Sequence, residues 1–512
     1  MKHDPLAPAA TRAPAPRKTG RRHGMTKAKG CAHVAVGSFS KLFPDLDPLP
    51  VGEDAAAVIG GPGGLMHDFD GGSPDCQVPA GYIFFAQFVD HDITLDTTSD
   101  LRGAALSTKA VSELPNIRSA SLDLDCVYGF GPEASPHIYD PDRPGRIAEN
   151  PNGFDLARSP GGVALIGDPR NDENIFVAQM QLLWQRFHNK LYEERVVADN
   201  AKTHFDRFEE AQKEARYHYQ WIVLFDFLKR ICDRDVYRFA AKRIVNGETF
   251  PLCYGPDAHG KLTMPVEFSA AAFRVGHTMV RSTYAANADN TDVELFDEAF
   301  GATGFGPLPE ALAVDWRWML PVNPHQRPRM SKAFDPLLAD EIQNMPRPVV
   351  PSNNPNDRAL AFRNLLRGNA LGLPSGQAVA EALKAKGYPV APCDIRAGEL
   401  RGWDRLGESA ARLAENTPLF YYLLRESELK TCGERFGPTG SALLMEVFGG
   451  MLTLCSTSFL SEPEWRPDPI VSKERRSWLR DGYLEDFDLH RVIDDDDYYP
   501  LELADIARFV AK

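Results

Sequence analysis

The sequence has few cysteines and no long apolar run. Eight cysteines occur in 512 residues, none in a CxxC pair, which argues against a zinc site or a dense disulfide framework. No stretch of about 18 or more apolar residues is present, so no transmembrane helix is expected. The start of the chain is basic, but no apolar core of roughly 7–15 residues follows it, as a secretory signal would require. We therefore expect a cytoplasmic protein, or one secreted by a non-standard route.

The sequence also lacks an excess of basic charge. It has 57 Lys and Arg against 71 Asp and Glu, a formal net charge of −14. Residues 1–30 hold eight Lys and Arg and one acidic residue, and their Ala- and Pro-rich composition predicts a disordered basic arm. The rest of the chain then has 49 basic and 70 acidic residues, a net charge of −21. This acidic body argues against a nucleic-acid partner.

Aromatic residues are plentiful, and the apolar pattern is that of helices. The 29 Phe and 7 Trp are enough for a sizeable core. From residue 81 onward helical periodicity dominates, and one apolar stripe with steps of three and four comprises Val177, Met180, Trp184, Phe187 and Leu191. We predict a mainly α-helical protein with long loops and little β structure, folded as one large domain over residues 31–512.

Three further segments have clear local signals. Residues 219–227 are apolar nearly all round, which predicts a fully buried helix. Residues 377–386 and 408–416 are predicted to be helical. Four prolines within residues 345–355 predict an extended connection, because proline cannot donate to a helix ladder.

The first motif that carries chemistry is GYIFFAQFVDHD, over residues 81–92. On a helix, Gln87, Asp90 and His91 stand at i, i+3 and i+4, so one face carries all three. Burying such a polar triad among aromatic residues costs free energy unless each group finds a partner. Taken alone, the motif is better explained as a helix end with an acidic cap and a satisfied histidine.

The second motif is GDPRNDE, which precedes the amphipathic helix. A simple capping arrangement would explain part of it, with Asp168 or Asn171 as the cap and acidic residues near the positive end of the helix dipole. Capping does not explain an arginine at that end. We expect Arg170 to point at an anion or a polar ligand.

The third and fourth motifs each combine an arginine with another polar residue. In FRVGH, Arg274 and His277 stand at i and i+3, and the intervening glycine leaves room beside the histidine. In NLLRGNALGLP, Asn364 and Arg367 share a helix face, and the helix is expected to end at the Gly-Leu-Pro. Each motif by itself could be ordinary helix surface.

The combination of the four motifs suggests a haem bound between helices. One histidine would ligate the iron, and the other would act on a bound peroxide. Two arginines on the ligating side could pair with the two haem propionates.

The same motifs resemble those of the animal-type haem peroxidases of the peroxidase–cyclooxygenase superfamily. FAQFVDHD is similar to the family's distal motif, DPRNDE to its catalytic-arginine motif, FRVGH to its proximal motif and NLLRGNALGLP to its asparagine–arginine helix. They occur in the family's order between about residues 81 and 374, and a tail over residues 432–467 resembles bacterial members. The resemblance implies a single helical haem-peroxidase domain.

The resemblance also implies a catalytic role for three residues. His91 would be the distal acid–base residue and Arg170 its partner. Gln87 matches the residue that hydrogen-bonds distal water and borders the halide site.

The implied cofactor is haem b. The residues that match its binding site are His277, Asn364, Arg274, Arg367, Asp90 and Glu173. His277 would ligate the iron, and a hydrogen bond from its Nδ1 to Asn364 would make the imidazole a stronger donor. The two arginines match propionate partners, and the two carboxylates match those that form ester bonds to haem methyl groups. Asn174 stands where some members have a methionine, so a sulfonium link is not expected.

A calcium site is implied as well. The loop SASLDLD is similar to the family's calcium loop, and the implied ligands are Asp92, Ser119, Ser121, Asp123 and Asp125. Oxygen ligands at alternate positions suit a hard cation with about six to eight ligands. The alternation of Leu and Asp would also fit a half-buried strand. We favour calcium because Asp92 stands beside the distal histidine, where the pattern requires it.

The function implied is a haem-dependent peroxidase that reduces hydrogen peroxide and oxidises a small donor, such as a halide, thiocyanate or a phenol. The main alternative is a fatty-acid oxygenase of the same superfamily. Its tyrosine would stand three residues before the proximal histidine, where this chain has Arg274. A non-catalytic haem or adhesion protein is a further alternative, which the loss of His91 or Arg170 would have indicated. The sequence does not choose the donor or the oligomeric state.

Overall fold

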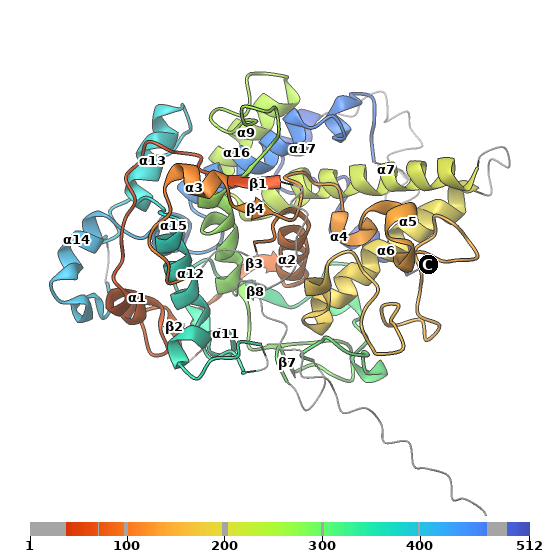
Figure 1. Ribbon diagram of the computed structural model, residues 1–512, viewed down its shortest axis with the longest axis horizontal. Coiled ribbons are helices and arrows are strands. Elements are labelled where there is room, and N and C mark those ends of the chain that lie inside the picture. Colours follow the sequence, from red (N-terminus) through yellow and green to blue (C-terminus); the bar gives the residue numbers. More distant parts are fainter. Residues whose placement is uncertain are drawn as a thin grey trace, which may run out of the picture.

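The computed structural model describes residues 37–69, 71–96, 101–196, 203–297, 302–347, 349–397, 400–467 and 489–511. The predicted basic arm over residues 1–30 lies outside them. Helices dominate the described chain, and its longest strand has five residues (Figure 1). The prediction of a mainly α-helical fold is confirmed. The division into an arm and one domain stays a prediction.

The short strands pair in small groups. β1 (Gly37–Ser40) runs antiparallel to β4 (Pro115–Asn116) and parallel to β5 (Met264–Pro265). The other pairs are β2 (His67–Asp68) with β9 (Leu338–Ala339), β3 (Asp75–Pro79) with β8 (Met330–Lys332), and β6 (Thr283–Tyr284) with β7 (Val293–Glu294). Since none of these groups among the described residues exceeds three strands, helices must form the core.

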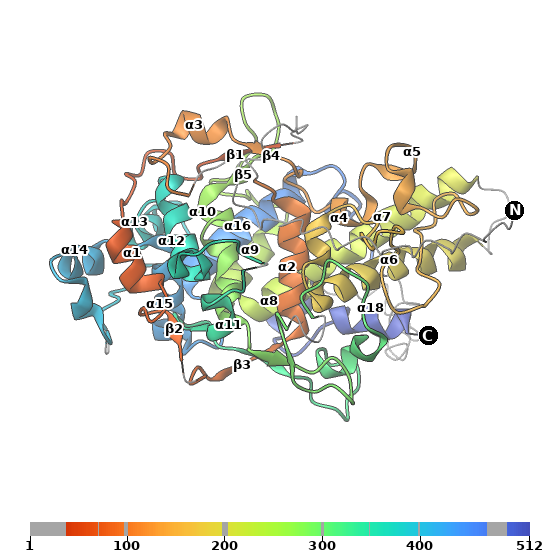
Figure 2. The ribbon, with the colours of Figure 1, turned by 60° about the horizontal axis from the view of Figure 1, so that its bottom comes forward.

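The α-helices in chain order are α1 (Glu53–Gly60), α2 (Gly81–Ile93), α3 (Thr108–Ser112), α4 (Asp125–Tyr128), α5 (Gly131–Ala134), α6 (Ile175–Val196), α7 (His204–Ile222), α8 (Leu228–Ile231), α9 (Arg234–Val245), α10 (Val266–Ser269), α11 (Asp340–Gln343), α12 (Leu360–Ala370), α13 (Gly376–Ala385), α14 (Ser409–Glu415), α15 (Leu419–Thr431), α16 (Pro438–Leu454), α17 (Leu489–Asp494) and α18 (Leu503–Val510). Figure 2 shows α2 in the middle of the molecule, with α6 and α7 on one side of it and α12 on the other.

Aromatic packing fixes α2 at the centre. Phe85 and Phe88 each lie 6.2 Å, between ring centroids, from Trp184 of α6, and both meet Tyr219 of α7 edge-on. Such pairs contribute about 0.5–1.5 kcal/mol each beyond the area they bury. The predicted apolar stripe of α6 is confirmed, because all five of its residues are buried. The face of α2 with Phe85 and Phe88 thus packs against α6 and α7. Gln87 and His91 of the same helix line a cavity.

Other local predictions are confirmed, two with a change of helix type. Residues 377–386 and 408–416 correspond to α13 and α14, and the proline-rich connection leads to a 3₁₀-helix at Pro355–Arg358. Residues 219–227 are fully buried, but the last five form a π-helical turn, η3 (Val223–Phe227). The FRVGH segment is a 3₁₀-helix, η4 (Ala272–Met279). Residues three apart eclipse in a 3₁₀-helix, so Arg274 and His277 point the same way.

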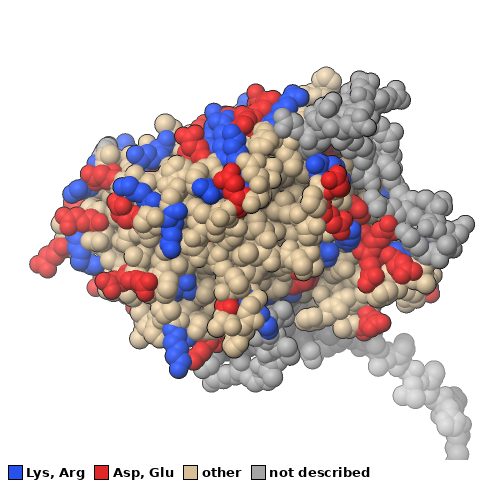
Figure 3. All heavy atoms as spheres, turned by 90° about the horizontal axis from the view of Figure 1, so that it is seen from above, with Lys and Arg blue, Asp and Glu red and all other residues tan. Residues whose placement is uncertain are grey.

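The buried residues form one main hydrophobic cluster from Phe39 to Phe509. On the face seen in Figure 3, acidic and basic side chains are interspersed around a broad uncharged area, with no gathered basic patch. None of the helices in the described residues is long and apolar enough to cross a membrane.

Candidate active site

The predicted catalytic and haem-binding residues come together around two adjoining cavities between α2, η4 and α12. The larger, of about 550 Å³, is lined by Gln87, Asp90, His91, Arg170, Glu173, Arg274 and His277. The smaller, of about 70 Å³, shares four of these residues and adds Asn364 and Arg367. The sequence therefore identified a set of residues that meet in space, although they come from four separate segments. Their individual roles stay predictions.

The tautomer of His91 is fixed by a chain of hydrogen bonds that starts at the backbone. The Gln181 amide Nε2 donates to the carbonyl of Cys126 (3.1 Å), so its Oε1 must accept from Asn171 Nδ2 (2.8 Å). Asn171 Oδ1 then accepts from His91 Nδ1 (2.7 Å). His91 therefore carries its proton on Nδ1, and Nε2 is left as a base.

Burial keeps His91 neutral. The side chain is 2% exposed, and burial, reinforced by the nearby Arg170 cation, lowers its pKa. A neutral imidazole can accept a proton at Nε2, which lies 3.9 Å from Glu173 Oε1. The sequence suggested Asn171 only as a helix cap, and its position directly after Arg170 was the one signal for this second role.

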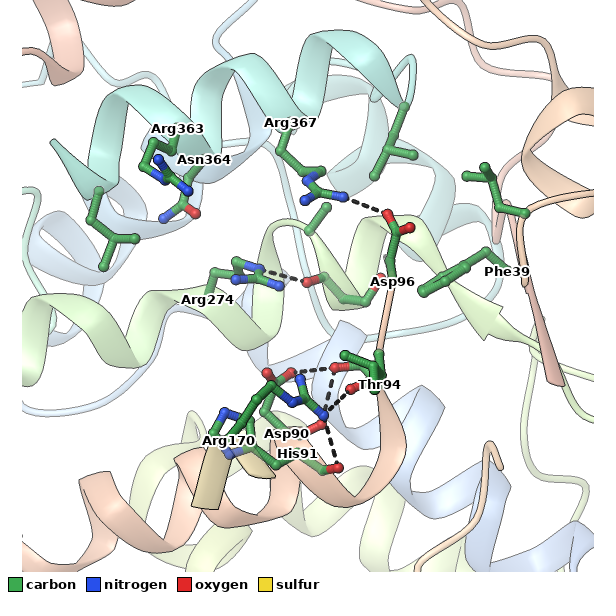
Figure 4. A pocket seen from close by; sticks show the side chains of 16 residues that line it. Phe39, Asp90, His91, Thr94, Asp96, Arg170, Arg274, Arg363, Asn364 and Arg367 are labelled. Carbon is green, nitrogen blue, oxygen red and sulfur yellow. Dashed lines mark hydrogen bonds and ion pairs between the residues drawn. The ribbon is translucent and has the colours of Figure 1, made fainter. Parts of the chain in front are cut away.

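Arg170 is held by a buried carboxylate that also binds a second arginine. Asp168 accepts from Arg170 Nε (3.1 Å) and Nη2 (2.8 Å), and from Arg118 Nε (3.0 Å) and Nη2 (2.6 Å). Arg170 Nη2 also donates to the backbone oxygens of His91 (3.0 Å) and Thr94 (2.6 Å), as Figure 4 shows. The two cations hold the pKa of Asp168 well below its usual range despite its burial. Two arginines thus share one buried carboxylate beside His91, where Glu173 and Asp90 add further negative charge.

Asp168 is also the cap that the sequence suggested. Its side chain accepts from the backbone N–H of Arg170 at the start of a 3₁₀-turn, η2 (Pro169–Asp172). The preceding Gly167 packs so closely on the carbonyl oxygen of Asp125 that a Cβ would lie 2.4 Å from it. This close approach fixes η2 against the predicted calcium loop. Arg118, which directly precedes that loop, is not among the residues predicted from the sequence.

Both polar atoms of the Gln87 side-chain amide form hydrogen bonds. Its Nε2 donates to Glu173 Oε1, and its Oε1 accepts from Asn174 Nδ2 (3.3 Å). Glu173 thus faces the distal side, between Gln87 and His91. Asp90 lines the same cavity and accepts from Thr94 Oγ1 (3.0 Å). Both predicted ester residues are therefore next to the space a haem would fill.

The proximal side matches the predicted pairing. The Asn364 amide nitrogen lies 3.2 Å from His277 Nδ1. Nε2 is then the imidazole nitrogen that would ligate a metal. Because the oxygen and nitrogen of an amide are interchangeable by a flip, the same contact suits an Nδ1–H donor. Arg274 Nε donates to the Ser269 carbonyl (2.9 Å), and Arg367 Nη1 donates to Asp96 (2.5 Å). The pairing of Arg367 with Asp96 was not predicted.

A haem fits this space by the chemistry of its lining. The larger cavity falls within the range of about 300–1,000 Å³ typical of cofactor sites, and much of its wall is apolar. His277 would hold the iron, and Arg274 and Arg363, which form no ion pair with a carboxylate of the described residues, line the smaller cavity, where anionic groups could bind. The residues present therefore suit the cofactor.

The predicted calcium loop is not a strand, because Leu124 has φ +60° and α4 follows it. Ser119 Oγ donates to Asp125 Oδ2 (2.9 Å), and Ser121 Oγ donates to Asp123. Asp92 accepts from the N–H groups of Leu124 and Cys126, and from Tyr219 OH (3.2 Å). The donors are all oxygens, as calcium prefers.

The three carboxylates of this loop region lie near one another without converging. Burial and the neighbouring Asp125 raise the pKa of Asp92 to about 8, a repulsion that a cation would relieve. Within the described residues, no three acidic, histidine or cysteine side chains are arranged closely enough to hold a metal ion. Calcium therefore stays a prediction.

Comparison with known proteins agrees with the resemblance to animal haem peroxidases. The family model for animal haem peroxidases matches residues 104–383. No curated protein sequence matches the chain. Peroxidase A from Dictyostelium discoideum has a similar structure, with 15% identity and a TM-score of 0.56 over 85% of this chain and 91% of that one.

Two plant enzymes share the fold as well. The fatty acid alpha-dioxygenase of Oryza sativa has 15% identity and a TM-score of 0.54 over 89% of this chain and 79% of that one. The fatty acid alpha-dioxygenase of Arabidopsis thaliana has 14% identity and a TM-score of 0.55 over 90% and 76%. At such identities the likeness concerns the fold alone.

The position of Asp168 between two arginines predicts a large effect of its neutralisation. Asp168→Asn would leave Arg118 and Arg170 without their shared anion, and breaking a buried charge cluster in this way costs about 3–5 kcal/mol. Denaturant unfolding should show a loss of this size. The matched control is Asp315→Asn, which removes the partner of the exposed Arg317 and should cost at most about 1 kcal/mol. Equal losses in the two variants would contradict the assigned role.

Proposed function

The chain belongs to the animal haem peroxidase family, and on that basis we propose that it is a haem-dependent peroxidase, an oxidoreductase that reduces hydrogen peroxide and oxidises a small donor. One observation carries the proposal. His91 and Arg170, each held by its own buried partner, line the same cavity as His277. The proposed donor is a halide, thiocyanate or a phenol.

His277 would hold the haem iron, and the haem would supply the redox chemistry by which peroxide is reduced and a donor oxidised. The protein's own residues move the proton and the charge. Nε2 of neutral His91 takes the proton from one peroxide oxygen and returns it to the departing oxygen. Arg170 stabilises the negative charge that develops as the O–O bond breaks. Because Asp168 fixes the guanidinium in place, no reorganisation is needed at that moment.

The fatty-acid oxygenase is less well supported. Two of the similar folds are fatty acid alpha-dioxygenases, and an apolar chain would suit part of the larger cavity. The resemblance places the required tyrosine at Arg274, and no tyrosine is among the described residues that line either cavity. A non-catalytic haem or adhesion protein would have no need of the network that sets the tautomer of His91.

The two carboxylates at the cavity predict covalent attachment of the haem. If Asp90 and Glu173 form esters, acidified butanone should leave the haem with the denatured protein after exposure to peroxide. The double variant Asp90→Val with Glu173→Gln should release it. A pyridine haemochrome spectrum of both fractions measures the outcome. Haem extracted freely from the peroxide-treated wild type would exclude the esters and leave the peroxidase proposal standing.

The distal residues can be tested by a double-mutant cycle. His91→Ala should slow the reaction of the haem-loaded protein with hydrogen peroxide by roughly 10²–10⁴-fold, as expected for a positioned acid–base group. Arg170→Ala should also slow it, through the lost charge stabilisation. Because both act on one step, the double variant should be little worse than the poorer single variant. Stopped-flow mixing measures the three rates from the Soret band.

Matched controls for this cycle are His259→Ala and Arg317→Ala, which change exposed residues that line neither cavity. They should react at the wild-type rate. If His91→Ala and Arg170→Ala also react at the wild-type rate, neither residue is catalytic and the peroxidase proposal fails.

We further propose one calcium ion per chain, bound by Asp92, Ser119, Ser121, Asp123 and Asp125, with Ser121 contributing its backbone carbonyl. Removal of the ion should lower the thermal midpoint, because binding to the folded state alone stabilises it. It should also slow the reaction with peroxide, since Asp92 adjoins His91. Metal analysis of protein never exposed to a chelator measures the ion. A calcium content near zero would exclude the site.

A further inference from the structure

Three arginines line the wall of the smaller cavity formed by η4 and α12. They are Arg274, Arg363 and Arg367, and Figure 4 shows them above the distal residues. Positions 360, 363, 364, 367 and 371 of the α12 region all line this cavity, so they occupy one helix face. Arg363 had not been identified from the sequence, although it stands four residues before Arg367.

One of the three arginines already has an anionic partner. Arg367 Nη1 lies 2.5 Å from Asp96 Oδ2, and both side chains are largely buried. Among the described residues, no carboxylate lies within ion-pair distance of Arg274 or Arg363. The charge of Asp357 acts on Arg363 from outside the cavity lining, but the ion pair of Asp357 is with Arg102. Asp90 also lines the cavity, but Figure 4 places it on the opposite wall, beside His91 and Arg170. The wall of three arginines and Asp96 thus carries two guanidinium groups with no ion-pair partner among the described residues of that wall.

The guanidinium groups of Arg274 and Arg363 each donate one hydrogen bond to a backbone carbonyl. Arg363 Nη1 donates to the Asp357 carbonyl (2.7 Å), and Arg274 Nε donates to the Ser269 carbonyl (2.9 Å). Each group has further N–H donors with no partner among the described residues. Arg363 is 7% exposed, and burial together with the Arg367 cation lowers its pKa to about 10. An anion against these donors would offset both effects.

We propose that Arg274 and Arg363 bind the two haem propionates, and that Arg367 is committed to Asp96 and serves to fix the wall. The assignment rests on the proposed haem site. Two singly charged carboxylates match these two guanidinium groups, so the wall becomes neutral when the cofactor is bound. Arg363 lines the same cavity wall as Asn364, which contacts His277, and Figure 4 shows the two side chains next to each other on α12. The pair Arg274 and Arg367, expected from the resemblance, would leave Arg363 buried with no carboxylate of its own, because Asp357 is paired with Arg102.

The test compares two probes on the full chain, produced without haem and never exposed to peroxide. One probe is haem, and the other is haem dimethyl ester, whose propionates carry no charge. Soret titration gives the Kd for each. Arg363→Gln should raise the Kd for haem by about 10- to 100-fold, the loss expected for one charge-assisted hydrogen-bonded pair. It should leave the Kd for the ester unchanged, which also shows that the variant is folded.

Two further variants complete the test. Arg363→Lys keeps the charge and should recover much of the preference for haem over the ester. The double variant Asp96→Asn with Arg367→Gln removes a matched pair without changing net charge, so it should keep the wild-type ratio of the two affinities. The assignment is wrong if Arg363→Gln keeps the wild-type ratio of the two affinities. It is also wrong if the double variant loses the preference for haem as fully as Arg363→Gln does, because Arg367 would then be a propionate partner. Wild-type protein that binds neither probe would overturn the haem proposal itself.

Discussion

Asp168 is fully buried, and a buried carboxylate persists only where cations and hydrogen-bond donors replace the water it has lost. Here Arg118 and Arg170 supply that compensation from two different segments of the chain. The requirement fixes the distal half of the site, because η2 cannot move without exposing the carboxylate. Arg170 is in turn bound to the carbonyls at the end of α2, so the same constraint locates it beside His91.

The neighbouring loop is joined to this arrangement through the backbone. The carbonyl of Cys126 accepts from Gln181, and the chain continues through Asn171 to His91. Gly167 packs on the same stretch, against the carbonyl of Asp125. The predicted calcium loop and the residue that follows it, Cys126, therefore contact the distal site through Gln181 and through Gly167. A structural change in that loop can therefore reach His91 through these contacts. This connection is additional to the adjacency of Asp92 and His91 in the sequence.

The two walls of the cavity differ in their balance of buried charges. On the distal side the cations are matched to a buried anion, so a histidine can remain neutral nearby. On the wall of η4 and α12, cations outnumber anions, which is costly in a buried site unless a ligand brings negative charge. Haem, an apolar disc with two carboxylates at one edge, meets both the apolar lining and the excess of cations on that wall.

The sequence by itself determined that the fold is mainly helical, and it predicted residues that the fold brings together at the two cavities. Periodicity and end signals are local properties, so α2, α6, α13 and α14 could be predicted from spacing alone. Four motifs also identified the nine residues that meet at the two cavities. The orientation of Asn171 toward His91, the sharing of Asp168 by Arg118, and the partners of Arg363 and Arg367 were decided only by the tertiary structure. Arg363 is held by a residue close to it in the chain, Asp357, but only the fold places its side chain at the cavity. The contacts of Asn171, Asp168 and Arg367 each depend on a residue of another segment, about 50 to 270 positions away. Partners at such separations leave no trace in a local pattern.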